Sequence, residues 1–259
     1  MDALKRFEKA GGTGITLVNL PYPHIPIKDS SGFQKGYELT IRMAEEARER
    51  TALTVNVALG PYPVTFLHLR EAIGVERAYE EMESALEIAA QYVKEGKAQA
   101  IGEVGRPHFE TDPEAVRLCD LLLQKAMELA SDCGCPVIIH SESVTSEEMQ
   151  GFALMADEAR LDRGMVVKHL SPPLTTREEN HGVLPSLPAS RSAIRQAISK
   201  GGDFLIETDY IDDPKRPGAA MDIVSVPKRV KGLMQSGELS EEKAERCGRD
   251  LPARLYGGA

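Results

Sequence analysis

The chain has 259 residues and a mass of 28.3 kDa, with 42% apolar and 27% charged residues, which is enough for a large core. No apolar run approaches the roughly 18–20 residues of a membrane helix, and the charged start is unlike a secretory signal, so we expect a cytoplasmic protein without a membrane segment. The net charge of −9 argues against nucleic-acid binding through the overall field, although a local basic patch is compatible with it.

Strand-like and helix-like segments alternate along nearly the whole chain. The first part is expected to contain a helix over 4–10, a strand over 15–18, a helix around 37–44, a strand over 53–59 and a helix over 78–89. Capping boxes at 111–114 and 145–148 are expected to begin the helices that precede strands at 136–140 and 165–169.

The last third continues this alternation. The segment 182–187 is a weaker strand candidate, because Pro185 cannot donate a backbone hydrogen bond. A short helix at 194–198, a strand at 204–209 and helical segments at 226–234 and 241–255 complete the chain.

A repeated strand–helix unit of roughly 30 residues predicts a parallel barrel. We therefore expect a single domain over 1–259 with the α/β fold of a (β/α)8 TIM-type barrel. The pattern contains only seven strands and opens on a helix, so the alternative is an incomplete barrel whose first strand is missing.

Four of the predicted strands end in residues that can bind a divalent metal. They are Glu103, His140, His169 and Asp209. Because the carboxyl ends of parallel barrel strands converge at one mouth, these side chains are expected to meet. Glutamate, histidine and aspartate are ligands for zinc or a similar ion, and a catalytic site keeps positions open for water.

These segments resemble motifs of the TatD-like metal-dependent hydrolases, within the amidohydrolase-type barrels. The motifs are 101–105 (IGEVG), 136–141 (PVIIHS), 168–169 (KH), 205–209 (LIETD) and 251–257 (LPARLYG). The resemblance implies that Glu103 bridges two metals, that His140 and His169 are ligands, and that Asp209 binds metal and orients the attacking water. It also implies a 3′–5′ deoxyribonuclease activity.

The chain departs from this family at several places. The family's first strand carries His-x-His, and no such motif occurs here. We expect that the native chain starts upstream of Met1 with that strand; the alternative is an incomplete site that binds one metal or none. Arg106, Pro107 and His108 follow the fourth-strand motif in place of the usual Leu-Asp, so substrate contacts are expected to differ.

Each candidate residue also has a structural interpretation. Glu103 could form an ion pair with Arg106 rather than bind metal. Asp209 could cap a helix, although Asp212 and Asp213 are better placed to do so. Glu207 points the same way as Asp209, and either supports a metal ligand or forms a buried ion pair.

Basic residues follow several strand ends and predict an anionic substrate such as a phosphoester, unless they are solvated loop charges. They are Arg106, Lys168, Lys215 and Arg216. His24 and His108 lie in loops on the same face and are expected to contact substrate or to donate a proton.

We therefore predict a metal-dependent hydrolase with one or two Zn, Mg or Mn ions, in which Glu103 and Asp209 are catalytic. Its expected substrate is a small molecule or a single-stranded nucleic acid, cleaved at a phosphodiester bond. One alternative is hydrolysis of a cyclic amide, lactone or other ester at the same site. The other is an inactive barrel that binds a ligand or partner.

Overall fold

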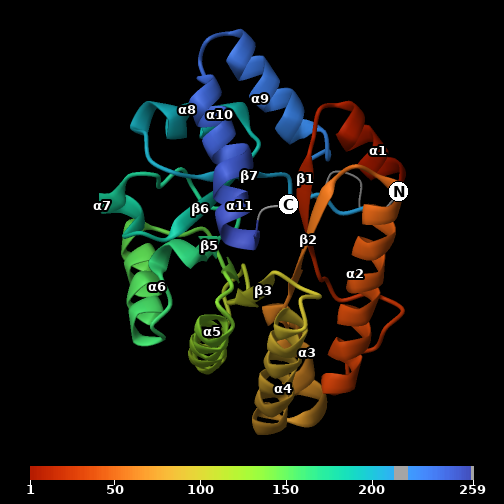
Figure 1. Ribbon diagram of the computed structural model, residues 1–259. Helices are drawn as coiled ribbons and strands as arrows, with labels where there is room; N and C mark the ends of the chain where they lie inside the picture. Colours follow the sequence, from red (N-terminus) through yellow and green to blue (C-terminus); the bar gives the residue numbers. More distant parts are fainter. Residues whose placement is uncertain (213–220, 258–259) are drawn as a thin grey trace.

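Seven parallel strands in chain order make one curled sheet in the computed structural model, which describes residues 1–212 and 221–257. The strands are β1 (Gly14–Val18), β2 (Thr54–Leu59), β3 (Ala100–Gly105), β4 (Val137–His140), β5 (Val166–Lys168), β6 (Leu184–Pro188) and β7 (Leu205–Glu207). Each strand pairs with the next one in the chain, and β1 and β7 stand at the two edges (Figure 1). The architecture is a TIM-type half-barrel, as the strand count predicted.

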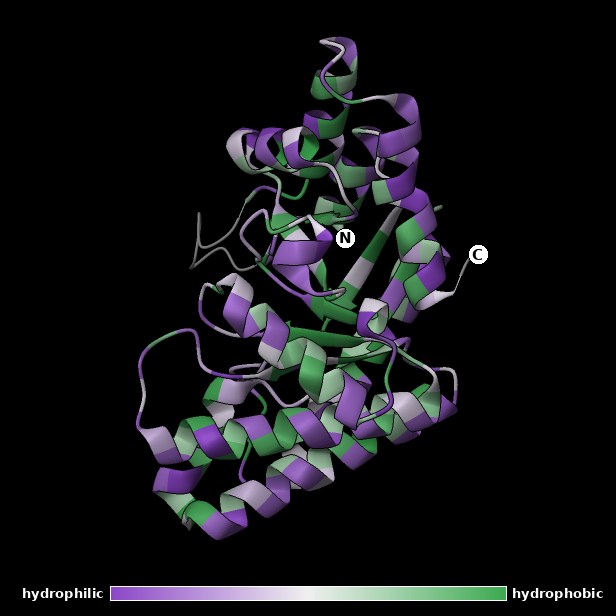
Figure 2. Ribbon diagram, turned by 90° about the vertical axis from the view of Figure 1, so that its left-hand side faces the viewer, coloured by the Kyte–Doolittle hydropathy of each residue, from purple (hydrophilic) through white to green (hydrophobic). Residues whose placement is uncertain are grey.

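Most of the helices cover the outer face of this sheet, and those that lie between two strands in the chain connect them. Before β4 these are α1 (Asp2–Lys9), α2 (Ser30–Arg50), α3 (Pro63–Ile73), α4 (Val75–Lys94) and α5 (Pro113–Cys133). After β4 come α6 (Ser146–Glu158), α7 (Arg177–Asn180), α8 (Arg191–Lys200), α9 (Ser225–Gln235), α10 (Glu241–Glu245) and α11 (Leu251–Tyr256). Figure 2 shows strands coloured as hydrophobic in the interior, surrounded by helices that mix hydrophilic and hydrophobic residues. Among the described residues, no helix is both long and apolar enough to cross a membrane.

Two of the predicted helix starts can be compared with the structure. The capping box at Thr145 and Glu148 is confirmed, since the Glu148 side chain accepts a hydrogen bond from the Thr145 N–H at 2.7 Å. The box predicted at 111–114 is wrong. Asp112 caps α5 instead, because its Oδ1 accepts from the Ala115 N–H at 2.9 Å and Pro113 takes the first helical position.

Sequence patterns missed two helices, α3 and the short α7, and gave too little weight to one strand. Helix α3 was not predicted; it follows β2 directly and starts on Pro63. The segment containing Pro185 is a strand, β6. Pro185 lies where the short ladder with β5 ends and the ladder with β7 begins, so its missing N–H interrupts little pairing.

The C-terminal helix fills the interior of the open barrel. Leu251 and Leu255 of α11 are buried in one cluster with a residue from each of β2 to β7: Ala58, Ala100, Ile138, Val167, Leu184 and Leu205. Val18 of β1 packs against the same cluster. Helix α11 therefore joins both halves of the sheet through apolar contacts, although the edge strands β1 and β7 do not pair with each other.

Candidate metal centre

A β-bulge in β3 sets the position of Glu103. Gly102 pairs with Ile138 and Val104 with Ile139, so Glu103 is the extra residue between two paired positions. Bulges re-aim side chains, and they are common next to active sites. A Cβ on Gly102, at φ +155°, would lie 2.7 Å from Cβ of Ile138. Glycine therefore lets β3 approach β4 closely at this bulge, where the buried Glu103 faces His140.

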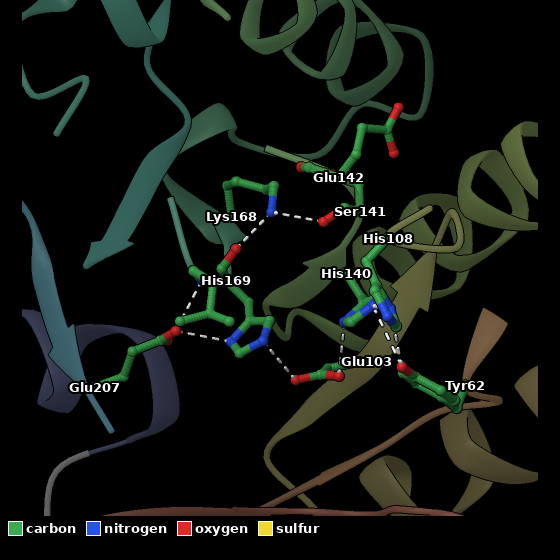
Figure 3. Close-up of polar contacts among 10 residues, drawn as sticks. Tyr62, Glu103, His108, His140, Ser141, Glu142, Lys168, His169 and Glu207 are labelled. Atoms are coloured by element: carbon green, nitrogen blue, oxygen red, sulfur yellow. Dashed lines mark hydrogen bonds and ion pairs between the residues drawn. The ribbon is translucent and has the colours of Figure 1, made fainter. Parts of the chain in front are cut away.

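Three of the predicted ligands come together at the carboxyl ends of β3, β4 and β5. Each of Glu103, His140 and His169 offers one ligand atom, and these three atoms lie within 4.8 Å of one another (Figure 3). Nδ1 of His140 is 3.2 Å from Glu103 Oε2, and Nε2 of His169 is 3.4 Å from Glu103 Oε1. All three side chains are buried, so the group is held in a region of low dielectric.

Glu207 of β7 holds His169 in one orientation. Oε1 of Glu207 lies 2.8 Å from Nδ1 of His169 and also accepts from the Leu170 N–H at 2.7 Å. Its other oxygen accepts from the Ser186 hydroxyl at 2.5 Å. With the Nδ1–H directed at Glu207, Nε2 of His169 is the nitrogen that faces Glu103. Of the two roles expected for Glu207, the geometry therefore favours support of a ligand.

His140 contacts two further side chains through its other ring nitrogen. Nε2 of His140 is 3.2 Å from Nδ1 of His108 and 3.4 Å from the Tyr62 hydroxyl. The Tyr62 ring meets the His140 ring edge-on, with centroids 4.9 Å apart. Sequence reasoning named His108 but missed Tyr62, although Tyr62 follows the end of β2 by three residues and that position is a signal in a parallel barrel.

The charged side chains of the group shift one another's pKa values. Burial alone would raise the pKa of Glu103, but the facing His169, His140 and Lys168 outweigh it and the pKa is lowered. Burial would lower the pKa of His169, yet the carboxylates of Glu103 and Glu207 raise it to about 9. The carboxylate of Glu103 is thus kept charged, and a positive charge is favoured beside it.

One buried polar atom of the group is left without a hydrogen bond. Nδ1 of His140 is within ion-pair distance of Glu103, but no described residue offers it a well-aligned hydrogen bond. An orphaned buried imidazole nitrogen beside a buried carboxylate and a second imidazole matches the donor set of a divalent transition metal. These residues therefore fit a metal ion.

Asp209 stands outside the three-residue group. It follows β7 by two residues, with a left-handed backbone at φ +49°. Burial raises the pKa of its half-buried carboxyl to about 6, and Glu103 and Glu207 add to this effect against the opposing charge of His169. Asp209 is thus electrostatically coupled to the group. Of the competing helix caps, Asp212 accepts from the Tyr210 hydroxyl, and Asp213 lies outside the described residues.

Arg106, predicted to lie at the rim, is held by acidic neighbours. It binds Asp120 through two hydrogen bonds of 2.6 and 2.9 Å, and its Nη1 is 3.6 Å from Glu142. Arg106 thus pairs with Asp120 and Glu142, whereas Glu103 faces His140 and His169, so the alternative of a Glu103–Arg106 pair is wrong.

The other predicted substrate contacts are more scattered. Lys168 is fully buried and donates to the carbonyls of His169 and Ser141, which contradicts a place at the rim. Burial lowers its pKa to about 8. His24 is exposed, with its ring 5.9 Å from that of Tyr22. Lys215 and Arg216 lie outside the described residues.

The chain is similar to known proteins in sequence and in fold. The uncharacterized protein MJ1127 of Methanocaldococcus jannaschii is 32% identical over 253 residues, which cover 97% of this chain and 88% of that protein. A solved structure of a TatD homologue from Escherichia coli K12 superposes with a TM-score of 0.67 at 21% identity, covering 100% of this chain and 92% of the other. An organophosphorus hydrolase from Deinococcus radiodurans has a TM-score of 0.63 at 17% identity, with 95% and 91% covered.

Because these two structures are only 21% and 17% identical in sequence, the likeness to them shows a shared fold alone. The family model described as TatD related DNase matches residues 1–257. The chain that brings Glu103, His140 and His169 together therefore belongs to the TatD-related DNase family.

Proposed function

We propose that this protein is a metal-dependent phosphodiesterase that acts on single-stranded nucleic acid. The observation that carries the proposal is the buried group of Glu103, His140 and His169, whose ligand atoms lie within 4.8 Å of one another. The description of the matching family as DNases supports the choice of a phosphodiester bond.

The proposed ligands are Glu103 through its carboxylate, His140 through Nδ1 and His169 through Nε2. Two imidazoles and one carboxylate favour zinc over magnesium, because Mg²⁺ prefers oxygen ligands. When bound, such an ion polarises a phosphoryl oxygen and makes water more acidic. Glu207 would keep His169 in the tautomer that leaves Nε2 available.

Asp209 is the proposed base. Its carboxyl is half-buried and has a pKa raised to about 6, so it is ionised at pH 7 and yet more basic than an exposed aspartate. It would accept a proton from the attacking water at its carboxylate oxygen and hold it until the leaving group departs. His108 is exposed next to His140 and is the proposed contact for the leaving group, with His24 on the same face of the barrel.

The test is hydrolysis by the metal-loaded protein of two substrate sets, a single-stranded DNA oligonucleotide and a panel of lactones. We expect DNA cleavage that Asp209→Asn reduces by at least about a hundredfold, as expected for loss of a general base. The matched control is Asp212→Asn in the same segment, which contacts Tyr210 and should cleave normally.

Two results would overturn the proposal. Turnover of lactones without DNA cleavage would assign the site to ester hydrolysis. A purified protein that holds only traces of metal, removable by mild chelation, would favour an inactive barrel that binds a ligand.

A further inference from the structure

Four basic side chains surround a hollow of about 200 Å³ between α8 and α9, and none of the metal ligands lines it. Arg191 and Arg195 come from α8, and Lys228 and Arg229 from α9. We call this site the basic hollow. In a chain with a net charge of −9, such a concentration of positive charge is local and separate from the overall field.

Most of this charge is not neutralised by the protein. Arg195 is paired with Glu238 through hydrogen bonds of 2.5 and 2.8 Å. Within the described part of the chain, Arg191, Lys228 and Arg229 have no carboxylate within ion-pair distance. Among the described residues that line the hollow, one carboxylate therefore faces four cations, and the excess suits an anion that accepts several charge-assisted hydrogen bonds, such as a phosphate group.

The first turn of α8, which carries Arg191 of the basic hollow, lies at the same end of the barrel as the metal centre. Helix α8 begins three residues after Pro188, the carboxyl end of β6, and α8 and α9 lie together beside β6 and β7 (Figure 1).

A short relay of hydrogen bonds connects the two sites. Arg229 Nε donates to the Ala189 carbonyl at 3.1 Å, and the Ala189 N–H donates to the Glu207 carbonyl at 2.8 Å. The side chain of Glu207 in turn holds His169. The hollow is therefore anchored to the residue that orients a proposed metal ligand.

We propose that the basic hollow is a phosphate subsite, which holds a backbone phosphate of the nucleic-acid strand that is cleaved at the metal centre. This inference rests on the proposed function, because it assigns the substrate a second point of attachment. It also accounts for the anionic substrate expected from the sequence, since Arg106 is already paired and Lys168 is buried.

Gly232 of α9 offers a direct test. It is an exposed helical residue that lines the hollow, and a Cβ added there meets nothing within 4 Å. Gly232→Glu would place a carboxylate beside the hollow, and Gly232→Gln is a neutral control of the same size. Both should preserve the fold, because glycine is the poorer helix former.

Binding of fluorescein-labelled dT10 would be measured by anisotropy in the presence of a chelator, so that no cleavage is needed for a signal. We expect Gly232→Glu to weaken binding at least about tenfold, because the added like charge repels the phosphate, and Gly232→Gln to remain within about twofold. The double variant Arg191→Ala/Lys228→Ala should weaken binding. It should also make the slope of log affinity against log salt concentration less steep by about one to two. Lys94→Ala/Arg117→Ala, on α4 and α5, should do neither.

Equal binding by the wild type, Gly232→Glu and the Arg191/Lys228 double variant would overturn the inference. Inorganic pyrophosphate separates two sources of phosphate: if it binds in the hollow while dT10 binding ignores these substitutions, the site serves free phosphate and the subsite proposal is wrong. If these substitutions weaken dT10 binding but the protein does not cleave DNA with any metal added, the subsite is supported and the phosphodiesterase proposal is not. If the protein cleaves DNA with metal and the variants keep the wild-type KM, the phosphodiesterase is supported and the subsite is not.

Discussion

The carboxylate of Glu207 lies 2.8 Å from Nδ1 of His169, and Nε2 of the same ring lies 3.4 Å from Glu103 (Figure 3). One histidine thus connects a carboxylate on β7 with a carboxylate on β3, across the mouth of the barrel. The contact with Glu207 determines which nitrogen of His169 is available to a metal, and this dependence can be tested.

Replacing Glu207 with glutamine should weaken metal binding about 10- to 100-fold. The amide keeps the size of the side chain but has only one acceptor oxygen for the three donors His169 Nδ1–H, Leu170 N–H and Ser186 O–H. Competition with a chromophoric chelator would give the affinity. Glu179→Gln, which breaks an ion pair with Lys200 elsewhere, is the control. An unchanged affinity in Glu207→Gln would show that His169 needs no such support.

Replacing His108 with alanine should reduce metal affinity less, by under about tenfold. His108 contacts Nε2 of His140, but Tyr62 already lies 3.4 Å from the same atom and water can reach the exposed position. The same chelator competition would rank the variants. A larger loss in His108→Ala than in Glu207→Gln would reverse the proposed order of importance.

Metal affinity should rise with pH between about 7 and 9. In the metal-free protein the carboxylates of Glu103 and Glu207 hold the pKa of His169 at about 9 against the effect of burial, so Nε2 carries a proton at pH 7. A metal must displace that proton, which predicts a gain of up to about tenfold per pH unit. Calorimetry in buffers with different protonation enthalpies would count the released proton, and a pH-independent affinity over this range would contradict the prediction.

The stability of the metal-free protein should change in the opposite direction, falling as the pH rises. A folded-state pKa of about 9, raised from 6.5, contributes stability that is fully present below pH 6.5 and is lost as pH rises through 9. We therefore expect the melting temperature of metal-free protein to fall over this interval. His169→Asn, which cannot titrate there, should show a smaller fall.

Replacing Tyr37 with phenylalanine should stabilise the fold by about 1 kcal/mol. Its ring is fully buried, and its hydroxyl has no hydrogen-bond partner among the described residues, so removing the oxygen removes a desolvation penalty. Urea denaturation would measure the change. Tyr22→Phe is the matched comparison and should destabilise, because the Tyr22 hydroxyl is hydrogen-bonded to Thr40 at 2.9 Å. A loss of stability in Tyr37→Phe would indicate an unseen partner such as buried water.

Much of the fold could be predicted because its signals are local. Apolar runs that end at His140 and in Glu207 have the length of buried strands, and turn residues separate them from amphipathic helices. Helix α3 escaped prediction because it follows β2 almost without a loop and its apolar residues are not confined to the buried face of Phe66 and Leu69. The part played by α11 could not be predicted either, because only the tertiary structure shows that Leu251 belongs to a cluster with residues of six strands.

The residues of the candidate site were also only partly predictable from the sequence. Glu103, His140 and His169 could be chosen because parallel strands deliver their last residues to one edge. Lys168 could not be placed, because a lysine at a strand end is expected at the rim, and the Ser141 carbonyl that its buried ammonium contacts comes from a distant part of the chain. Tyr62 and the basic hollow belong to the same class of features, since each depends on contacts between elements that are distant along the chain.

By itself, the sequence determined the order of strands and helices and which residues stand at the strand ends, because hydrophobic period and turn chemistry act over a few neighbouring residues. Only the tertiary structure decided which of those residues meet. The bulge at Glu103, the orientation of His169 by Glu207 and the anchoring of Arg229 to Ala189 all arise where separate strands and helices pack. Such contacts depend on ångström-scale geometry that no local pattern of residues encodes.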